Sequence, residues 1–152
     1  MNGAEGPRRV HDAPPLPEKA KPREAPSPDL EQVPFWDATG DGRLLVQRCV
    51  NGHHQLYPRA HCITCREAVE WVDASGFATV YSFTVLRQHF SRSLRHLLPL
   101  VVALVDLDEG PRLMTNLVNV EPEDVRVGMR VEVWFEAVSD TAALPMFTPV
   151  PA

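Results

Sequence analysis

The stretch PLVVALVDLDEGPRLMTNLV, residues 99–118, decides the class of fold. It consists of a dense apolar run at 99–107, the residues Asp-Glu-Gly-Pro at 108–111, and a second apolar run at 112–118. Glycine supplies the positive φ that a tight turn needs, and proline suits the start of the strand that follows. Two short apolar runs on either side of such a turn predict a β-hairpin.

Strand-like segments lie on both sides of this hairpin. Upstream, 69–72 (VEWV) alternates between apolar and polar residues, and 77–86 (FATVYSFTVL) is β-branched and aromatic. Downstream, 130–137 (RVEVWFEA) alternates strongly and 144–148 (LPMFT) closes the series, while 121–124 is expected to form one helical turn. Five main strands with a helical element between the third and the fourth favour an OB-type barrel. An antiparallel sandwich or an SH3-like barrel are the alternatives.

The N-terminal part differs in composition. The first 34 residues hold eight of the fifteen prolines and few large apolar residues. Proline fixes φ and has no N–H group, so it suits neither a helix nor a sheet. In addition, the segment has too little apolar surface to offset the entropy lost on ordering. We therefore expect 1–28 to be disordered, either as a tail without function or as a tether for a partner. Phe35 and Trp36 should then begin a short helix that Gly40 and Gly42 end.

The predicted protein is thus mostly β and has four parts. A disordered, proline-rich arm at 1–28 is followed by a helical and strand lead-in at 29–46. A knuckle of the zinc-ribbon kind is expected at 47–72, and a five-stranded OB-fold barrel at 73–150.

The knuckle contains all three cysteines of the chain, in CVNGHHQLYPRAHCITC at 49–65. Cys62 and Cys65 have the spacing of one half of a zinc ribbon, and Cys49 lies where the other half should begin. The second cysteine of that half is missing, since Gly52 occupies its position. An imidazole can replace it, so we predict a Zn²⁺ site formed by Cys49, His53, Cys62 and Cys65.

Alternatives to this site remain open at this point. His54 or His61 are other sources of the imidazole. A degenerate ribbon without metal, held by the packing of Leu56, Tyr57 and Trp71, would also fit. A redox-active Cys-x-x-Cys fits less well, because such motifs begin a helix in a βαβ setting that the sequence does not show.

A basic segment, RQHFSRSLRHLL at 87–98, stands out in an acidic protein. It carries three arginines and two histidines and no carboxylate, with apolar residues between them. Arginine binds phosphate through paired hydrogen bonds, and the apolar residues suggest contact with protein. We predict a contact surface for a partner subunit or for the phosphates of coenzyme A at Arg87, Phe90, Arg92 and Arg95. A solvated loop without a ligand is the alternative.

Composition excludes several classes of protein. The formal net charge is −5 and the pI is near 5.6, which argues against nucleic acid as a partner. No apolar run reaches the ~18 residues of a membrane span, and the N-terminus does not have the pattern of a secretory signal. Three cysteines, two of them closely spaced, fit a reducing cytoplasm better than a disulfide framework. No motif for a nucleophile, a phosphate loop or a dinucleotide is found, so we do not expect an independent enzyme.

Several segments together resemble one protein family over about residues 33–150. They are GRLLVQRC, HHQLYPRAHCITC, GFATVYSFTVLR, VVALVDLDEGPRLMTNLV and GMRVEVWFE. The family comprises zinc-ribbon and OB-fold proteins associated with acyl-CoA metabolism, long catalogued as a domain of unknown function. Its ribbons usually carry the second cysteine of the first pair, which Gly52 replaces here.

The resemblance implies a helical lead-in, a rubredoxin-like ribbon and an OB barrel. It also implies a non-catalytic accessory subunit in a hetero-oligomer with a thiolase-like or ketosynthase-like protein, supporting assembly and the acyl-CoA site. A module that binds acyl-CoA or an acyl carrier directly is the second hypothesis. A single-stranded nucleic-acid binder is the third, and the acidic charge disfavours it.

Overall fold

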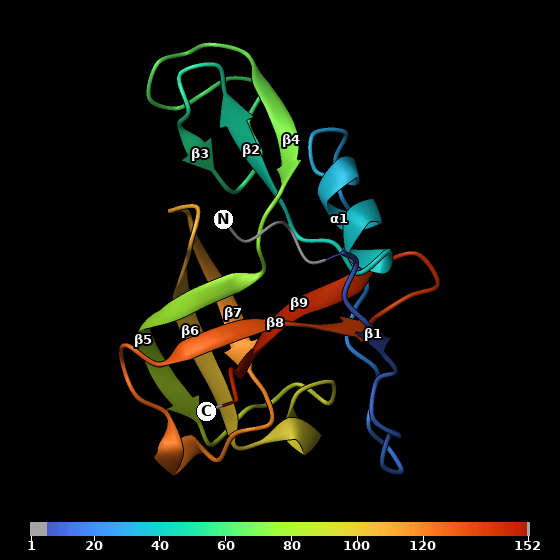
Figure 1. The fold of residues 1–152 in the computed structure, drawn as a ribbon. Helices are drawn as coiled ribbons and strands as arrows, with labels where there is room; N and C mark the ends of the chain where they lie inside the picture. Colours follow the sequence, from blue (N-terminus) through green and yellow to red (C-terminus); the bar gives the residue numbers. More distant parts are fainter. Residues whose placement is uncertain (1–5, 152) are drawn as a thin grey trace.

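The computed structural model describes residues 6–151 and has a small three-stranded sheet above a closed β-barrel (Figure 1). Five strands form the barrel: β5 (Phe77–Leu86), β6 (Leu100–Leu107), β7 (Arg112–Leu117), β8 (Arg130–Ala137) and β9 (Ala143–Pro149). They pair in the order β8-β5-β6-β7-β9, and β9 returns to β8. The short helix η2 (Pro122–Asp124) lies between the third and fourth strands, which confirms the predicted order of elements.

The barrel encloses the main core because alternate residues of each strand face inward. In β6 these are Val101, Ala103, Val105 and Leu107, all nearly inaccessible to solvent. The predicted hairpin is present, since β6 pairs antiparallel with β7 from Val101 opposite Leu117 to Asp106 opposite Arg112. The parallel pairing of β7 with β9, by contrast, is limited to Leu117 and Phe147. The Oγ1 of Thr115 in β7 adds a hydrogen bond of 2.8 Å to the carbonyl of Pro145 in β9.

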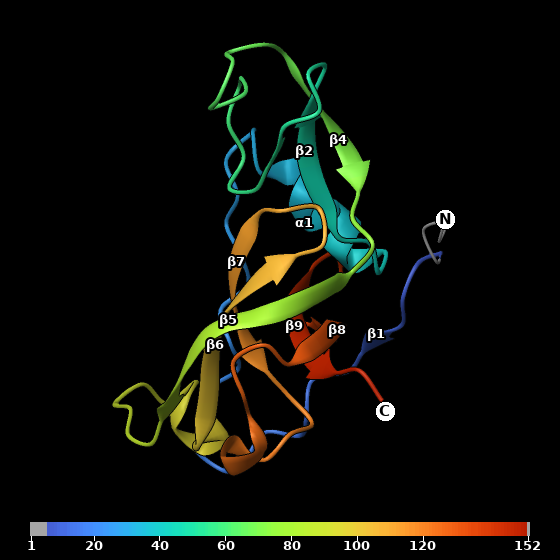
Figure 2. The ribbon, with the colours of Figure 1, turned by 60° about the vertical axis from the view of Figure 1, so that its left-hand side comes forward.

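The ribbon sheet consists of β2 (Leu45–Cys49), β3 (His54–Gln55) and β4 (Val69–Asp73), in the order β3-β2-β4. The helix α1 (Val33–Gly40) ends at Gly40 as predicted and lies between this sheet and the barrel (Figures 1 and 2). Thr39, fully buried, attaches α1 to the barrel: its Oγ1 accepts a hydrogen bond of 3.0 Å from the backbone N–H of Ala143 in β9.

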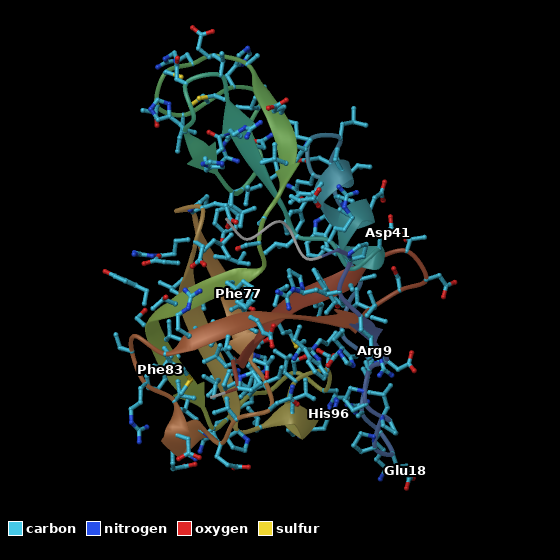
Figure 3. All side chains as sticks on the ribbon, viewed as in Figure 1. Arg9, Glu18, Asp41, Phe77, Phe83 and His96 are labelled. Carbon is cyan, nitrogen blue, oxygen red and sulfur yellow. The ribbon has the colours of Figure 1, made fainter. Side chains whose placement is uncertain are left out.

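The arm differs from the sequence expectation. Residues 6–28 follow one side of the barrel, where Arg9 and Glu18 mark their path in Figure 3. β1 (Val10–His11) pairs in parallel with the end of β8 that β5 leaves unpaired. His11 stacks on Trp134 at 3.5 Å between ring centroids, and Arg8 donates to the Glu132 carboxylate at 2.6 Å.

These contacts give the arm a physical reason to be ordered over the described part. The extended backbone that proline favours can pair with an open strand end, and stacking and charge contribute further stabilisation. Residues 1–5 of the predicted arm lie outside the described residues. The helices within 6–151 are all too short to span a bilayer, and α1, with eight residues, is the longest.

Candidate metal centre

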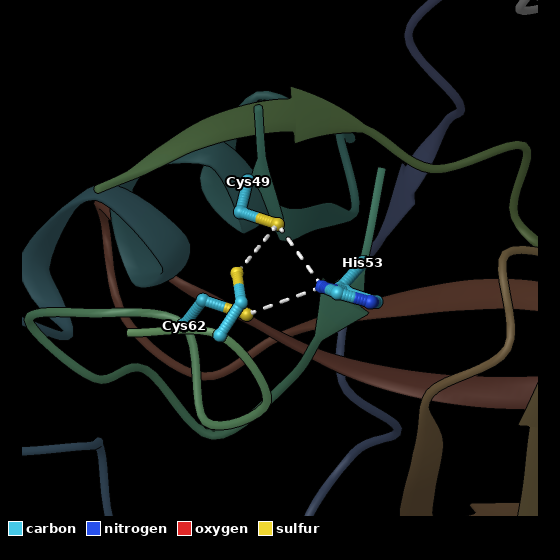
Figure 4. Close-up of side chains that lie close together, drawn as sticks. Cys49, His53 and Cys62 are labelled. Carbon is cyan, nitrogen blue, oxygen red and sulfur yellow. Dashed lines mark hydrogen bonds between the residues drawn. The ribbon is translucent and has the colours of Figure 1, made fainter. Parts of the chain in front are cut away.

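Two tight turns face each other at the tip of the ribbon and carry the three cysteines. Cys49 ends β2, and the turn after it is closed by a hydrogen bond of 2.9 Å from the Gly52 N–H to the Cys49 carbonyl. Gly52 has a φ of +81°, which glycine adopts without strain. In the second turn the N–H of Arg66 donates to the Cys62 carbonyl, also at 2.9 Å. Both turns point their thiols into the space between them (Figure 4).

The second turn is held by a buried pair of glutamines that sequence reasoning missed. The side-chain amide of Gln55 in β3 donates to the side-chain Oε1 of Gln47 at 2.8 Å, and the Oε1 of Gln55 accepts from the Ile63 N–H at 2.9 Å. Gln47 in turn donates to the carbonyl of Arg59 and accepts from the N–H of the same residue. The pair therefore fixes the chain on both sides of Cys62. The only sign of this glutamine pair in the sequence is that Gln47, a polar residue, occupies a position in a strand where an apolar residue is expected.

Four side chains meet at this tip: Cys49, His53, Cys62 and Cys65, whose ligand atoms all lie within 4.8 Å of one another. The Nδ1 atom of His53 is 3.4 Å from the Sγ of Cys49 and 3.7 Å from the Sγ of Cys62. The Sγ atoms of Cys49 and Cys65 are 3.7 Å apart. His54 and His61, the alternative imidazoles, are not part of this group.

These distances can be compared with the edges of a zinc tetrahedron. With Zn–S bonds of about 2.3 Å and Zn–N bonds of about 2.0–2.1 Å, two sulfurs lie about 3.8 Å apart and a sulfur and a nitrogen about 3.6 Å apart. The three separations given above are close to these edges. These three pairs of donors thus have the spacing that a tetrahedral zinc ion requires.

The backbone also favours the thiolate forms that bind metal. The N–H groups of Cys65 and Glu67 lower the pKa of the Cys62 and Cys65 thiols, respectively. Burial raises the pKa of the Cys49 thiol, an effect that the N–H groups of His53 and Asn51 partly oppose. A cation in the centre would stabilise all three thiolates.

The basic loop lies between β5 and β6, at the end of the barrel far from the ribbon. Phe90 is 95% exposed, and Arg92 is exposed beside it. Arg87 pairs with Glu123 at 3.1 Å across the surface, and Arg95 donates to the carbonyls of His89 and Phe90. Arg95 therefore shapes the turn that presents Phe90, whereas Arg87 is partly neutralised.

Carboxylates on the barrel are bound to arginines. Asp106 accepts two hydrogen bonds from Arg112, and Asp108 accepts two from Arg130. Each guanidinium lowers the pKa of its aspartate. These aspartates are exposed and ionised. A general acid would instead need a raised pKa, so that its carboxyl group is protonated near neutral pH.

Two family models match consecutive parts of the chain. The rubredoxin-like zinc ribbon domain of ChsH2 matches residues 36–70, and the C-terminal OB-fold domain of ChsH2 matches residues 71–136. A ribbon of this kind, together with the Cys₃His cluster, fits Zn²⁺ and confirms the predicted cofactor.

Relatives with similar sequence come from bacteria and archaea. A probable enoyl-CoA hydratase alpha subunit of Thermomonospora curvata is 35% identical over 94% of this chain and 44% of its own length. A DUF35 domain-containing scaffold protein of Pyrococcus furiosus is 36% identical over 59% of this chain and 66% of its own length. The chain thus spans less than half of the hydratase subunit.

A solved structure extends the match to three dimensions. The Ltp2-ChsH2(DUF35) aldolase contains a chain that is 31% identical to this one, with a TM-score of 0.74. The match covers 82% of this chain and 98% of the other. Ribbon and barrel therefore occur together in that chain as they do here.

Proposed function

The chain belongs to the DUF35 family of ChsH2-type proteins, and we propose that it is a non-catalytic accessory subunit of a thiolase-fold complex acting on acyl-CoA or acyl-carrier substrates. The observation that carries the proposal is the match to nearly the whole ChsH2(DUF35) chain of an aldolase that also contains a component named Ltp2. Relatives named scaffold proteins support a role in assembly. A relative named as an enoyl-CoA hydratase subunit supports acyl-CoA chemistry.

The four-residue cluster supports assembly rather than catalysis. We propose that Cys49, His53, Cys62 and Cys65 are the zinc ligands. Four protein donors close the tetrahedral shell and leave no position for a reacting water, whereas catalytic zinc sites keep one position open. The metal would then stabilise the ribbon, a segment with little apolar core of its own.

The basic loop is the part of the barrel best suited to contact a partner. Phe90 is almost fully exposed, and large aromatic side chains with arginine beside them are typical of the centres of protein interfaces. Arg92 and Arg95 add positive charge to the same segment. We propose that Phe90 and Arg92 contact the thiolase-fold subunit directly and that Arg87 and Arg95 support the surface around them.

Direct binding of acyl-CoA or an acyl carrier is the second candidate function. The observation that favours it is the run of cationic residues at 87–98, which contains no carboxylate. In that case the loop would bind the phosphates of the cofactor through Arg92.

Co-expression with a thiolase-like protein encoded beside this chain tests the proposal. We expect the two proteins to co-elute on gel filtration at a fixed ratio. We also expect calorimetry of the chain alone with coenzyme A to show weak binding or none. Separate elution would contradict the accessory role, and micromolar binding of coenzyme A by the lone chain would support the second candidate instead.

A further inference from the structure

A pocket of about 550 Å³ lies where the ribbon, α1 and the barrel meet. Residues of β7 and β9 line one side of it, the chain at 56–59 lines another, and α1 lines a third. Its volume falls within the range of about 300–1,000 Å³ that is typical of small-molecule sites. The pocket lies in a different part of the fold from the metal cluster and from the basic loop.

The lining is apolar over most of its surface. It includes the buried side chains of Phe35, Leu113 and Met146, the rings of Trp36 and Tyr57, and Leu56. Such a surface favours a hydrocarbon group over water. Cationic groups are also present, since Arg23 and Arg59 are among the fifteen lining residues and no carboxylate is.

The guanidinium of Arg23 has one N–H group that makes no hydrogen bond. Its Nη1 donates to the Asn116 side chain at 3.1 Å, but its Nε is buried and has no hydrogen-bond partner. The nearest carboxylate oxygen, on Glu136, is 4.0 Å from Nε, too far for a hydrogen bond. Burial lowers the pKa of Arg23 and raises that of Glu136, so desolvation outweighs their attraction. Arg23 and Asn116 both line the pocket, so an anionic acceptor bound there beside the guanidinium would be favourable.

The wall of the pocket is held in place by Tyr57. This residue has a φ of +63°, a conformation that costs energy for a side chain other than glycine. Its hydroxyl accepts a hydrogen bond of 3.3 Å from the Met114 N–H on the open edge of β7. The ribbon is thus joined to the barrel beside the pocket, which gives the pocket a defined shape in the absence of a ligand.

We propose that this pocket binds an aliphatic carboxylate, with the hydrocarbon chain among the apolar side chains and the carboxylate near Arg23. The two parts of the lining correspond to the two parts of such a ligand. The site goes beyond the proposed accessory function, because it belongs to this chain alone and requires no partner subunit.

Calorimetry of the full chain with octanoate and with 1-octanol tests the proposal. The two ligands share a chain length and differ in charge. We expect octanoate to bind at least tenfold more tightly than 1-octanol. Arg23→Gln should remove that difference by weakening octanoate alone. Equal affinity for the two ligands, or no saturable binding of octanoate, would overturn the proposal.

Further variants separate the charge effect from a change in folding. Met114 lines the pocket but is 63% exposed, so Met114→Glu should fold and should weaken octanoate by repulsion without weakening 1-octanol. Arg92→Gln, an equal loss of charge on the distant loop, should leave both affinities unchanged. The indole N–H resonance of Trp36 reports the location. A Trp36 signal that does not shift at saturating octanoate would place binding elsewhere and overturn the assignment.

Discussion

The Nδ1 atom of His53 lies 3.4 Å from the Sγ atom of Cys49, across the turn that in related ribbons carries a second cysteine. Gly52 closes this turn at a φ of +81°, and the imidazole of the next residue, His53, faces the thiols (Figure 4). His53 is the fourth member of the group that it forms with Cys49, Cys62 and Cys65, and we propose that it is the fourth zinc ligand. The three distances among these donors, 3.4, 3.7 and 3.7 Å, are compatible with ligands of a single metal ion.

Replacing this histidine should reduce zinc affinity. We expect one equivalent of zinc in the unmutated protein. Removing a residue that only hydrogen-bonds a metal ligand lowers metal affinity roughly 10–100-fold, and His53→Ala, which removes a ligand, should lower zinc affinity by more than that. His54→Ala, one residue away and outside the cluster, is the matched control and should retain the metal. Metal analysis after gel filtration and competition with a chromophoric chelator measure both. Substoichiometric zinc in the unmutated protein would mean that packing holds the ribbon.

Removing zinc should loosen the ribbon and leave the barrel intact. The strands of the ribbon sheet are short. Leu44 and Val46 join the main core cluster, but most members of that cluster are barrel residues. Hydrogen exchange with and without a strong chelator should therefore show faster exchange in residues 45–73 and unchanged protection in β6 and β7. Equal loss of protection in both regions would show that ribbon and barrel unfold as one unit.

Reversing charge on the basic loop should weaken the proposed complex. Arg92→Glu with Arg95→Glu removes two cations and adds two anions next to Phe90. We expect at least about a tenfold rise in Kd for the partner, equivalent to about 1.4 kcal/mol. Arg9→Glu with Lys19→Glu, the same change on the exposed arm, serves as control. Unchanged affinity of the loop variant, measured by surface plasmon resonance, would mean that the loop is merely solvated.

The barrel could be predicted from sequence because its signals are local. Turn chemistry at 108–111 and alternation in 130–137 each depend on a few adjacent residues, and each specifies a strand or a turn without reference to the rest of the chain. The same holds for Cys62 and Cys65, whose spacing alone indicates a ligand pair. Spacing could not choose among His53, His54 and His61, because the direction of each imidazole depends on the fold of the turn or strand that carries it.

Contacts between distant segments could not be predicted in the same way. The strand at Val10–His11 forms because β8 extends past β5, a property of the folded barrel and not of the arm's own residues. The pocket beside Arg23 likewise combines the arm, α1, the ribbon and two barrel strands. Proline content correctly argues against helix in the arm, yet it does not reveal a surface against which an extended chain can pack.

The contact between α1 and β9 should be sensitive to the hydroxyl of Thr39. Thr39→Val keeps the size of the side chain but leaves the buried N–H of Ala143 without an acceptor. We expect the free energy of unfolding to fall by about 1–3 kcal/mol, the cost of an unsatisfied buried donor. Thr39→Ser keeps the hydroxyl and loses one methyl group, so it should cost about 0.8 kcal/mol. Urea unfolding followed by fluorescence measures both, and a smaller effect in the valine variant would contradict this account.

Acid should destabilise the barrel partly through Asp106 and Asp108. Hydrogen bonds from Arg112 and Arg130 lower the pKa of these aspartates in the folded state. A lowered pKa contributes stability above the unfolded value of about 3.9 and loses it as the pH falls through the folded value. Asp106→Asn with Asp108→Asn should therefore flatten the fall in Tm below about pH 4.

The size and the salt dependence of this effect follow from exposure. Both ion pairs are partly open to solvent, with side chains around two-fifths exposed, so screening by salt should reduce the difference between variant and unmutated protein. Asp140→Asn, in the exposed turn between β8 and β9, removes one carboxylate without breaking either pair and is the control. Scanning calorimetry from pH 5 to pH 2 at low and high salt gives the comparison. Parallel Tm curves for the double variant and the unmutated protein would show that neither aspartate is linked to folding, whatever the geometry of its arginine.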